Sequence, residues 1–251
     1  MKYRILVALA LASCMAYAQG RGGPAGPPPP AKQAALFDPT GYWVSMIVDE
    51  WRFRVTPQKG DIPYLPINAE ARRIAMAWDP DKDFADGNAC RAYGAVGMMQ
   101  RPGRLHITWQ DDNTLKLESD AGTQTRLLHF GSKPDAPGPP NWQGYSVAQW
   151  QAVPRGRGAA AQAGVPGAGT LKITTTNMLP GYIRKNGVPY SEKAVLTEYI
   201  NRLAGSQNDD YIVVTAMVDD PTYLNQPFVR TYQFKKQADG TGWNPMPCLP
   251  R

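Results

Sequence analysis

Hydrophobic and polar residues alternate in short runs along most of the chain from residue 41 onward, and glycine, proline and aspartate separate the runs. Alternation with a period of two is typical of a β-strand that buries one face. The runs do not alternate with long helical segments, which argues against a parallel α/β sheet. The pattern predicts an all-β fold, an antiparallel barrel of about 8–10 strands with one short helix. The predicted strands span residues 41–48, 50–55, 103–110, 113–119, 124–130, 143–150, 170–176, 194–203, 211–218 and 228–236.

Three consecutive runs between residues 103 and 130 are the clearest part of this pattern. Short turns rich in aspartate and glycine join them, so we expect an antiparallel meander. If Asp111-Asp112 is a two-residue turn, His106 lies opposite Leu117. The face of His129, on the third strand, depends on the second turn, because a slip of one residue moves a side chain to the other face.

One segment has the spacing of a helix. Asn68 is a residue type that caps helices, and apolar residues follow it at positions 71, 74, 75 and 78. Asp79-Pro80 should end this helix. The aspartates that follow resemble a calcium-binding loop, but Phe84 and Cys90 stand where an EF-hand needs glycine and glutamate. We therefore expect a solvated turn there and no metal site.

The first 18 residues have the organisation of a secretory signal peptide, with charged residues, an apolar run at residues 5–12 and an A-x-A motif at residues 16–18. An alternative is a lipoprotein signal in which Cys14 carries a lipid anchor, but the short apolar stretch favours cleavage after Ala18. That stretch is also too short to cross a membrane, which takes about 20 residues. We expect a periplasmic or secreted protein without a membrane span.

The rest of the chain divides into two parts. Residues 19–35 consist largely of glycine, proline and alanine and include four consecutive prolines, which predicts a disordered leader. Residues 36–251 should form a single β-barrel domain.

The charge balance does not indicate a nucleic-acid partner. The chain has 27 Lys and Arg against 21 Asp and Glu, and the formal net charge of +6 falls to +4 when the signal peptide removes Lys2 and Arg4. The sequence also lacks P-loop, zinc-protease and serine-hydrolase motifs, so we expect no cofactor.

Two cysteines remain beyond the signal peptide, Cys90 and Cys248. In an oxidising compartment a lone pair of cysteines usually forms a disulfide. We therefore predict that this bond ties the proline-rich C-terminal end to the body of the domain, in preference to a reactive thiol.

Gly41 and Trp43, on the first predicted strand, form a G-x-W motif that resembles the first-strand motif of the lipocalins and related calycin barrels. In these families the tryptophan packs at the closed end of the barrel, often against an arginine from a late strand. The resemblance implies a lipocalin-like barrel in which Trp43 has the first role and Arg230 the second. The early helix and the long region 131–169 depart from the family pattern. The chain also resembles uncharacterised secreted bacterial proteins over most of its mature length, which implies no activity.

Two charged side chains are predicted to point into the barrel, Glu198 and Arg230. Each alternates along its strand with apolar or aromatic residues, among them Tyr232. Such an arrangement suits a barrel interior better than a dry sandwich core, because a charge among apolar neighbours needs a partner or a wet cavity. We expect the two charges to pair. The alternative is that Glu198 acts as a general acid whose pKa the apolar surroundings raise.

These features favour a barrel that binds a small, largely apolar or aromatic molecule, because ligand pockets are mostly apolar with a few placed polar groups. The expected ligand-binding residues are His106, Thr108, Glu198, Arg230 and Tyr232. One alternative is a barrel enzyme, a hydrolase or lyase, that uses Glu198 or His106 as acid or base. Another is an envelope scaffold without a small ligand. For His106 we favour the plainer interpretation of a half-buried histidine bonded to the backbone.

Overall fold

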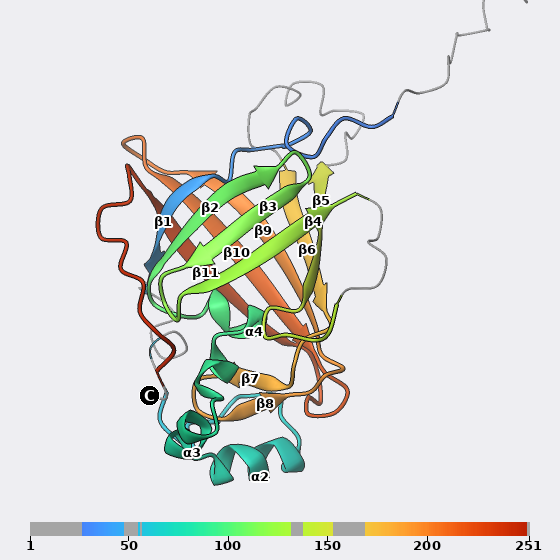
Figure 1. Cartoon of the computed structure of the whole chain (residues 1–251), viewed down its shortest axis with the longest axis vertical. Coiled ribbons are helices and arrows are strands. Elements are labelled where there is room, and N and C mark those ends of the chain that lie inside the picture. Colours follow the sequence, from blue (N-terminus) through green and yellow to red (C-terminus); the bar gives the residue numbers. More distant parts are fainter. Residues whose placement is uncertain (1–26, 48–54, 56, 132–137, 153–168, 250–251) are drawn as a thin grey trace, which may run out of the picture.

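The computed structural model describes residues 27–47, 55, 57–131, 138–152 and 169–249. Nine strands form a closed barrel in the order β1-β11-β10-β9-β6-β5-β4-β3-β2, which confirms the predicted all-β barrel (Figure 1). Most of the predicted strand 50–55 lies outside the described residues. The barrel strands are β1 Gly41–Met46, β2 Arg104–Asp111, β3 Thr114–Ser119, β4 Gln124–Phe130, β5 Tyr145–Ala152, β6 Gly169–Thr176, β9 Val195–Ala204, β10 Asp210–Asp219 and β11 Phe228–Gln237.

The barrel is antiparallel except at one place. β4 and β5 run parallel, with Leu128 beside Ser146 and Phe130 beside Ala148. An odd number of strands cannot alternate in direction all the way round a closed ring, so a barrel of nine strands needs at least one parallel pair. The predicted antiparallel order is therefore correct for the meander β2-β3-β4 and for the other neighbours, but not for β4 and β5.

Alternation along each strand fills the barrel interior with apolar side chains. Trp43 is fully buried there, and its indole nitrogen Nε1 donates to the carbonyl of Pro39 at 2.9 Å. The cation over its ring is Lys236, whose Nζ lies 5.3 Å from the ring centroid. Arg230 instead lies over the ring of Phe228. The closed barrel is thus consistent with a lipocalin-like fold, while the expected contact of Trp43 with Arg230 is replaced by one with Lys236.

Short helices and a small hairpin pack together beneath one end of the barrel, with α4 nearest to it (Figure 1). Asn68 caps α2 by accepting a hydrogen bond from the amide of Ala71, as predicted. The other helices were not predicted, because each has at most six residues and shows no helical repeat. These elements are α2 Ala69–Ala77, α3 Pro80–Ala85, the 3₁₀ helix Ala89–Ala92, α4 Ala95–Met98, β7 Gly181–Arg184 and β8 Val188–Tyr190. No helix among the described residues is long and apolar enough to cross a membrane.

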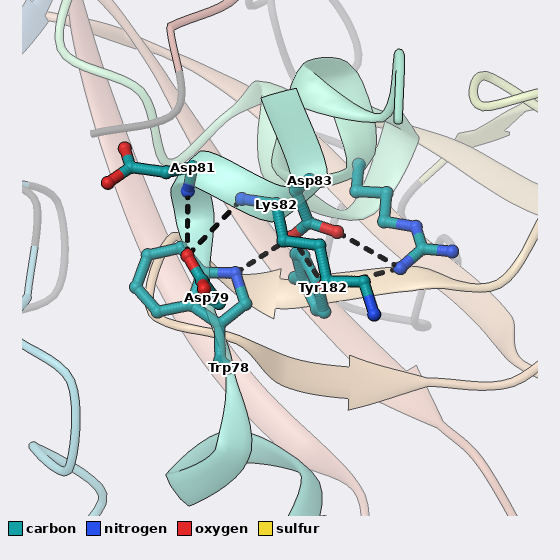
Figure 2. Close-up of polar contacts among 7 residues, drawn as sticks. Trp78, Asp79, Asp81, Lys82, Asp83 and Tyr182 are labelled. Atoms are coloured by element: carbon teal, nitrogen blue, oxygen red, sulfur yellow. Dashed lines mark hydrogen bonds and ion pairs between the residues drawn. The ribbon is translucent and has the colours of Figure 1, made fainter. Parts of the chain in front are cut away.

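The aspartates after α2 belong to the short helix α3 and its ends, so the expected turn is replaced by a helix, while most of these residues are exposed to solvent as expected. Asp79 caps α3 by accepting from the amides of Asp81 and Lys82. Asp83 accepts hydrogen bonds from the indole of Trp78 at 2.9 Å and from the hydroxyl of Tyr182 at 2.7 Å, and it also pairs with an arginine (Figure 2). Because Tyr182 belongs to β7, these bonds fasten α3 to the hairpin that carries part of the candidate site.

The N-terminal segment crosses the opposite end of the barrel (Figure 1). Ala31 is buried; its amide donates to Asn113 Oδ1 at 2.9 Å, and its carbonyl accepts from Trp150 Nε1 at 3.0 Å. The ring of Phe37 meets that of Trp150 edge-on, with 5.1 Å between centroids. The packed part of the chain therefore begins by residue 31, inside the stretch 19–35 that the sequence assigns to the leader.

Candidate functional site

The predicted internal ion pair exists, but with a different partner. Glu198 on β9 pairs with Arg126 on β4, with 2.5 Å between Oε2 and Nη2, and each side chain is 1% exposed. Arg126 also donates to the hydroxyls of Ser146 and Thr175. Arg230 shares the inward face, since Ala216 on β10 lies between it and Glu198 in register, but Glu198 forms its ion pair with Arg126.

Two polar atoms of this pair remain without a hydrogen-bond partner in the described structure, Glu198 Oε1 and Arg126 Nη1. Tyr232, another predicted ligand-binding residue, is also buried inside the barrel. A carboxylate that is ion-paired and almost wholly removed from solvent is poorly placed to exchange protons with a substrate. The geometry favours a structural role for Glu198 in the barrel interior over the acid role considered from the sequence.

His106 and Thr108 lie on the outer face of the barrel. The turn between β2 and β3 is formed by Asp112 and Asn113, not by Asp111 and Asp112 as predicted. A β-bulge between Trp109 and Asp111 offsets part of this displacement, so His106 lies opposite Glu118 and not opposite Leu117. Its Nδ1 is 3.2 Å from Glu118 Oε2, so its partner is a side chain and not the backbone. Thr108 lines a surface depression near the N-terminal segment.

His129 also faces outward, stacked on Tyr145 with 4.9 Å between ring centroids, and burial lowers its pKa. The wall of the barrel therefore separates both histidines from Glu198. They cannot act together on one substrate within the barrel.

The predicted disulfide is present, with 5.2 Å between the Cα atoms of Cys90 and Cys248. It fixes residues 244–249, the C-terminal strap, beneath the barrel. The strap is also held by a hydrogen bond from the amide of Met246 to the carbonyl of Asp120 at 2.8 Å, and by one from the Thr123 hydroxyl to the carbonyl of Met246 at 3.0 Å. The strap, which follows β11 along the chain, thereby becomes part of a pocket wall.

Between the strap and the end of the barrel lies a pocket of about 340 Å³. Its walls come from the chain after α4, the β3–β4 turn, the β7–β8 turn and the strap. Three of its side chains are cationic and one is anionic, and the aromatic ring of Tyr93 lies beside them. The charged residues are Arg101, Arg104, Lys185 and Asp120.

Arg101 is the unusual member of this pocket. Its side chain belongs to a residue only 4% exposed, and within the described structure neither Nε nor Nη2 has a hydrogen-bond partner. Its Cζ lies 6.0 Å from the ring centroid of Tyr93. Burial lowers the pKa of Arg101 to about 10, and the neighbouring cation Arg184 acts in the same direction. The group still carries its charge at neutral pH, so a buried cation lines the pocket without a carboxylate partner among the described residues.

Lys185 adds a second buried cation to the pocket. The residue is 5% exposed, and its Nζ lies 5.3 Å from the ring centroid of Tyr93. Both cations thus lie near one aromatic ring, an arrangement that stabilises each by cation–π attraction but leaves their hydrogen-bonding capacity available. An anion is the ligand that this arrangement can accommodate.

No protein-family model, curated protein or solved structure matches this chain. The pocket residues must therefore be judged by their geometry alone. Sequence reasoning missed Arg101, Arg104 and Lys185, because nothing in their local patterns marks a site. They converge only through the turns at the barrel end. Among the described residues, no cluster of histidine, cysteine, aspartate or glutamate could hold a metal ion.

Proposed function

We propose that this protein is an exported β-barrel that binds a small anionic molecule in the pocket beneath the barrel. The single observation that carries the proposal is the buried guanidinium of Arg101, whose Nε and Nη2 have no hydrogen-bond partner in the described structure. An uncompensated buried cation is costly to a fold. A bound anion would supply the missing partner.

Export is supported by the signal-peptide pattern of the first 18 residues and by the disulfide, since disulfides persist mainly in oxidising compartments. The proposal keeps the small-molecule ligand expected from the sequence but moves its site from the barrel interior to the barrel end. It also changes the chemistry, because charge would fix one end of the ligand while Pro102, Met246 and Pro247 contact a small apolar part. Binding is preferred over catalysis by Glu198 or His106, which lie on opposite sides of the barrel wall.

The test is thermal unfolding of the wild-type protein and of Arg101→Met in a series of anions at constant ionic strength. We expect anions to raise the Tm of the wild type and not that of R101M. We also expect R101M to be at least as stable as the wild type without ligand, because methionine fills similar space without a buried charge.

The matched control is Arg73→Gln, which removes an exposed cation of α2 that pairs with Glu70. This variant should respond to anions as the wild type does. An equal response of R101M and the wild type would overturn the proposal, and so would a marked loss of stability of R101M in the absence of any anion.

A further inference from the structure

The charges of the pocket favour a doubly charged ligand. Arg101, Arg104 and Lys185 contribute three positive charges and Asp120 contributes one negative charge, which leaves a net charge of +2. Asp120 is also turned toward the backbone, because its Oδ1 accepts from the amide of Arg104 at 2.7 Å. The surface next to the ligand is therefore more cationic than the count alone indicates.

The unpartnered nitrogens also have a definite geometry. Nε and Nη2 of Arg101 are both buried without a hydrogen-bond partner in the described structure. They lie on the same edge of the guanidinium, the edge with which an arginine can donate to two oxygens of one oxyanion. Nε of Arg104 is a third buried donor without a partner in the described structure. Lys185 Nζ adds donors from the β7–β8 turn. A carboxylate has two oxygens and one charge, whereas a phosphoryl group has three terminal oxygens and up to two charges.

From this match we infer that the anionic end of the ligand is a phosphoryl dianion, that of a small phosphomonoester. The inference rests on the proposed function and specifies its ligand class. The volume of about 340 Å³ limits the organic part of the ester to a small group, because pockets for drug-sized ligands begin at roughly that size. Arg101 holds two phosphoryl oxygens, while Arg104 and Lys185 neutralise the remaining charge.

The experiment is calorimetric titration of the full mature protein with four probes at constant ionic strength and neutral pH. The probes are phenyl phosphate, inorganic phosphate, sulfate and benzoate. We expect phenyl phosphate to bind at least about tenfold more tightly than benzoate, the difference that one additional charge contact of about 1.4 kcal/mol produces. Inorganic phosphate tests whether the ligand is an ester or the free ion. If it binds as tightly as phenyl phosphate, the organic group contributes nothing to affinity, and the ester assignment is overturned.

A pH series gives a second readout. The second ionisation of a phosphomonoester has a pKa near 6, so affinity should fall about tenfold as the pH is lowered from 8 to 5. Sulfate, which keeps its charge, should show no such fall. Arg101, with a pKa of about 10, remains charged over this range. Asp120→Asn is the control variant, because it removes the carboxylate that lines the pocket.

The outcomes separate the two proposals. If phenyl phosphate binds tightly to the wild type and does not bind to R101M, the anion site and the phosphoryl assignment are both supported. Benzoate binding as tightly as phenyl phosphate overturns the phosphoryl assignment and leaves the anion site in place. If none of the probes binds to the wild type, the proposed function itself fails. Binding that R101M retains would show that the ligand occupies another site.

Discussion

Arg126 and Glu198 form an ion pair across the interior of the barrel, joining β4 to β9 with 2.5 Å between their charged atoms. The pair also engages Ser146 on β5 and Thr175 on β6 through Arg126. Four strands are thus connected by one buried guanidinium.

Substituting Glu198 by glutamine should destabilise the protein strongly. The change leaves Arg126 buried without its counter-charge, which typically costs about 3–5 kcal/mol. Urea unfolding of Glu198→Gln measures the loss. The control is Glu118→Gln, because Glu118 pairs with His106 and Lys116 at the barrel surface and such exposed pairs contribute about 0–1 kcal/mol. Similar losses in the two variants would contradict a structural role for the internal pair.

Removing the disulfide should affect both stability and ligand binding. The bond joins residues 158 positions apart, and loss of a native disulfide usually costs about 2–5 kcal/mol. We expect Cys90→Ser with Cys248→Ser to unfold at lower denaturant concentration and to bind anions more weakly, since the strap forms one wall of the pocket. Unchanged affinity in this double variant would show that the strap keeps its place through its backbone hydrogen bonds.

Deleting residues 19–35 should lower stability, because the contacts of Ala31 with Asn113 and Trp150 are lost. We expect a loss of about 1–3 kcal/mol, the sum of two or three hydrogen bonds and a little apolar burial. The matched control deletes residues 19–26 and keeps every contact of Ala31. Equal melting temperatures for the two truncated proteins would favour the leader boundary at residue 36 that the sequence suggests.

Alkaline pH should weaken the region around α3 through Tyr182. Burial, followed by the hydrogen bond to Asp83, raises the pKa of this hydroxyl from 10.0 to about 12. The folded protein holds the proton more tightly than the unfolded chain, so the stabilisation is complete below pH 10 and is lost as the pH rises to about 12.

The size of this effect is about 2–3 kcal/mol, from the free energy that corresponds to each pKa unit. Unfolding of Tyr182→Phe should depend less on pH in this range than unfolding of the wild type. Burial also raises the pKa of Tyr190, so some dependence will remain in the variant. If the free energy of unfolding depends on pH equally in the wild type and in Tyr182→Phe, Tyr182 is not the cause of the alkaline destabilisation.

Alternation along the strands predicts faces well but not partners. It correctly points Glu198 and Arg230 inward, yet it offers no means of choosing between Arg230 and Arg126 as the partner. That choice depends on how β4, β5, β6 and β9 follow one another round the ring. For His106 the predicted partner is wrong by one residue, because the turn lies at Asp112-Asn113 and a bulge follows Trp109, and the sequence Asp111-Asp112-Asn113 does not fix either feature.

The pocket was harder to predict for a related reason. Arg101, Lys185 and the strap lie outside the strands and helices. In such segments hydrophobic and polar residues do not alternate regularly, so the pattern does not show where a side chain points. The disulfide between Cys90 and Cys248 was the one sequence feature that pointed to this part of the molecule. It identified which segments meet there, but not that cations line the space between them.

The parallel pair of β4 and β5 has a consequence for association with other chains. All other neighbouring strands of the barrel are antiparallel, so β4 and β5 are the two edge strands of one antiparallel sheet. Three residue pairs between β4 and β5 close this sheet into a barrel. If this junction opened, both edges would become available at once for pairing with another molecule, a common origin of aggregation. The hydrogen bond from Arg126 to Ser146 crosses the junction from the inside at 2.9 Å. Arg126 therefore helps to protect the protein against edge-to-edge aggregation while it neutralises Glu198.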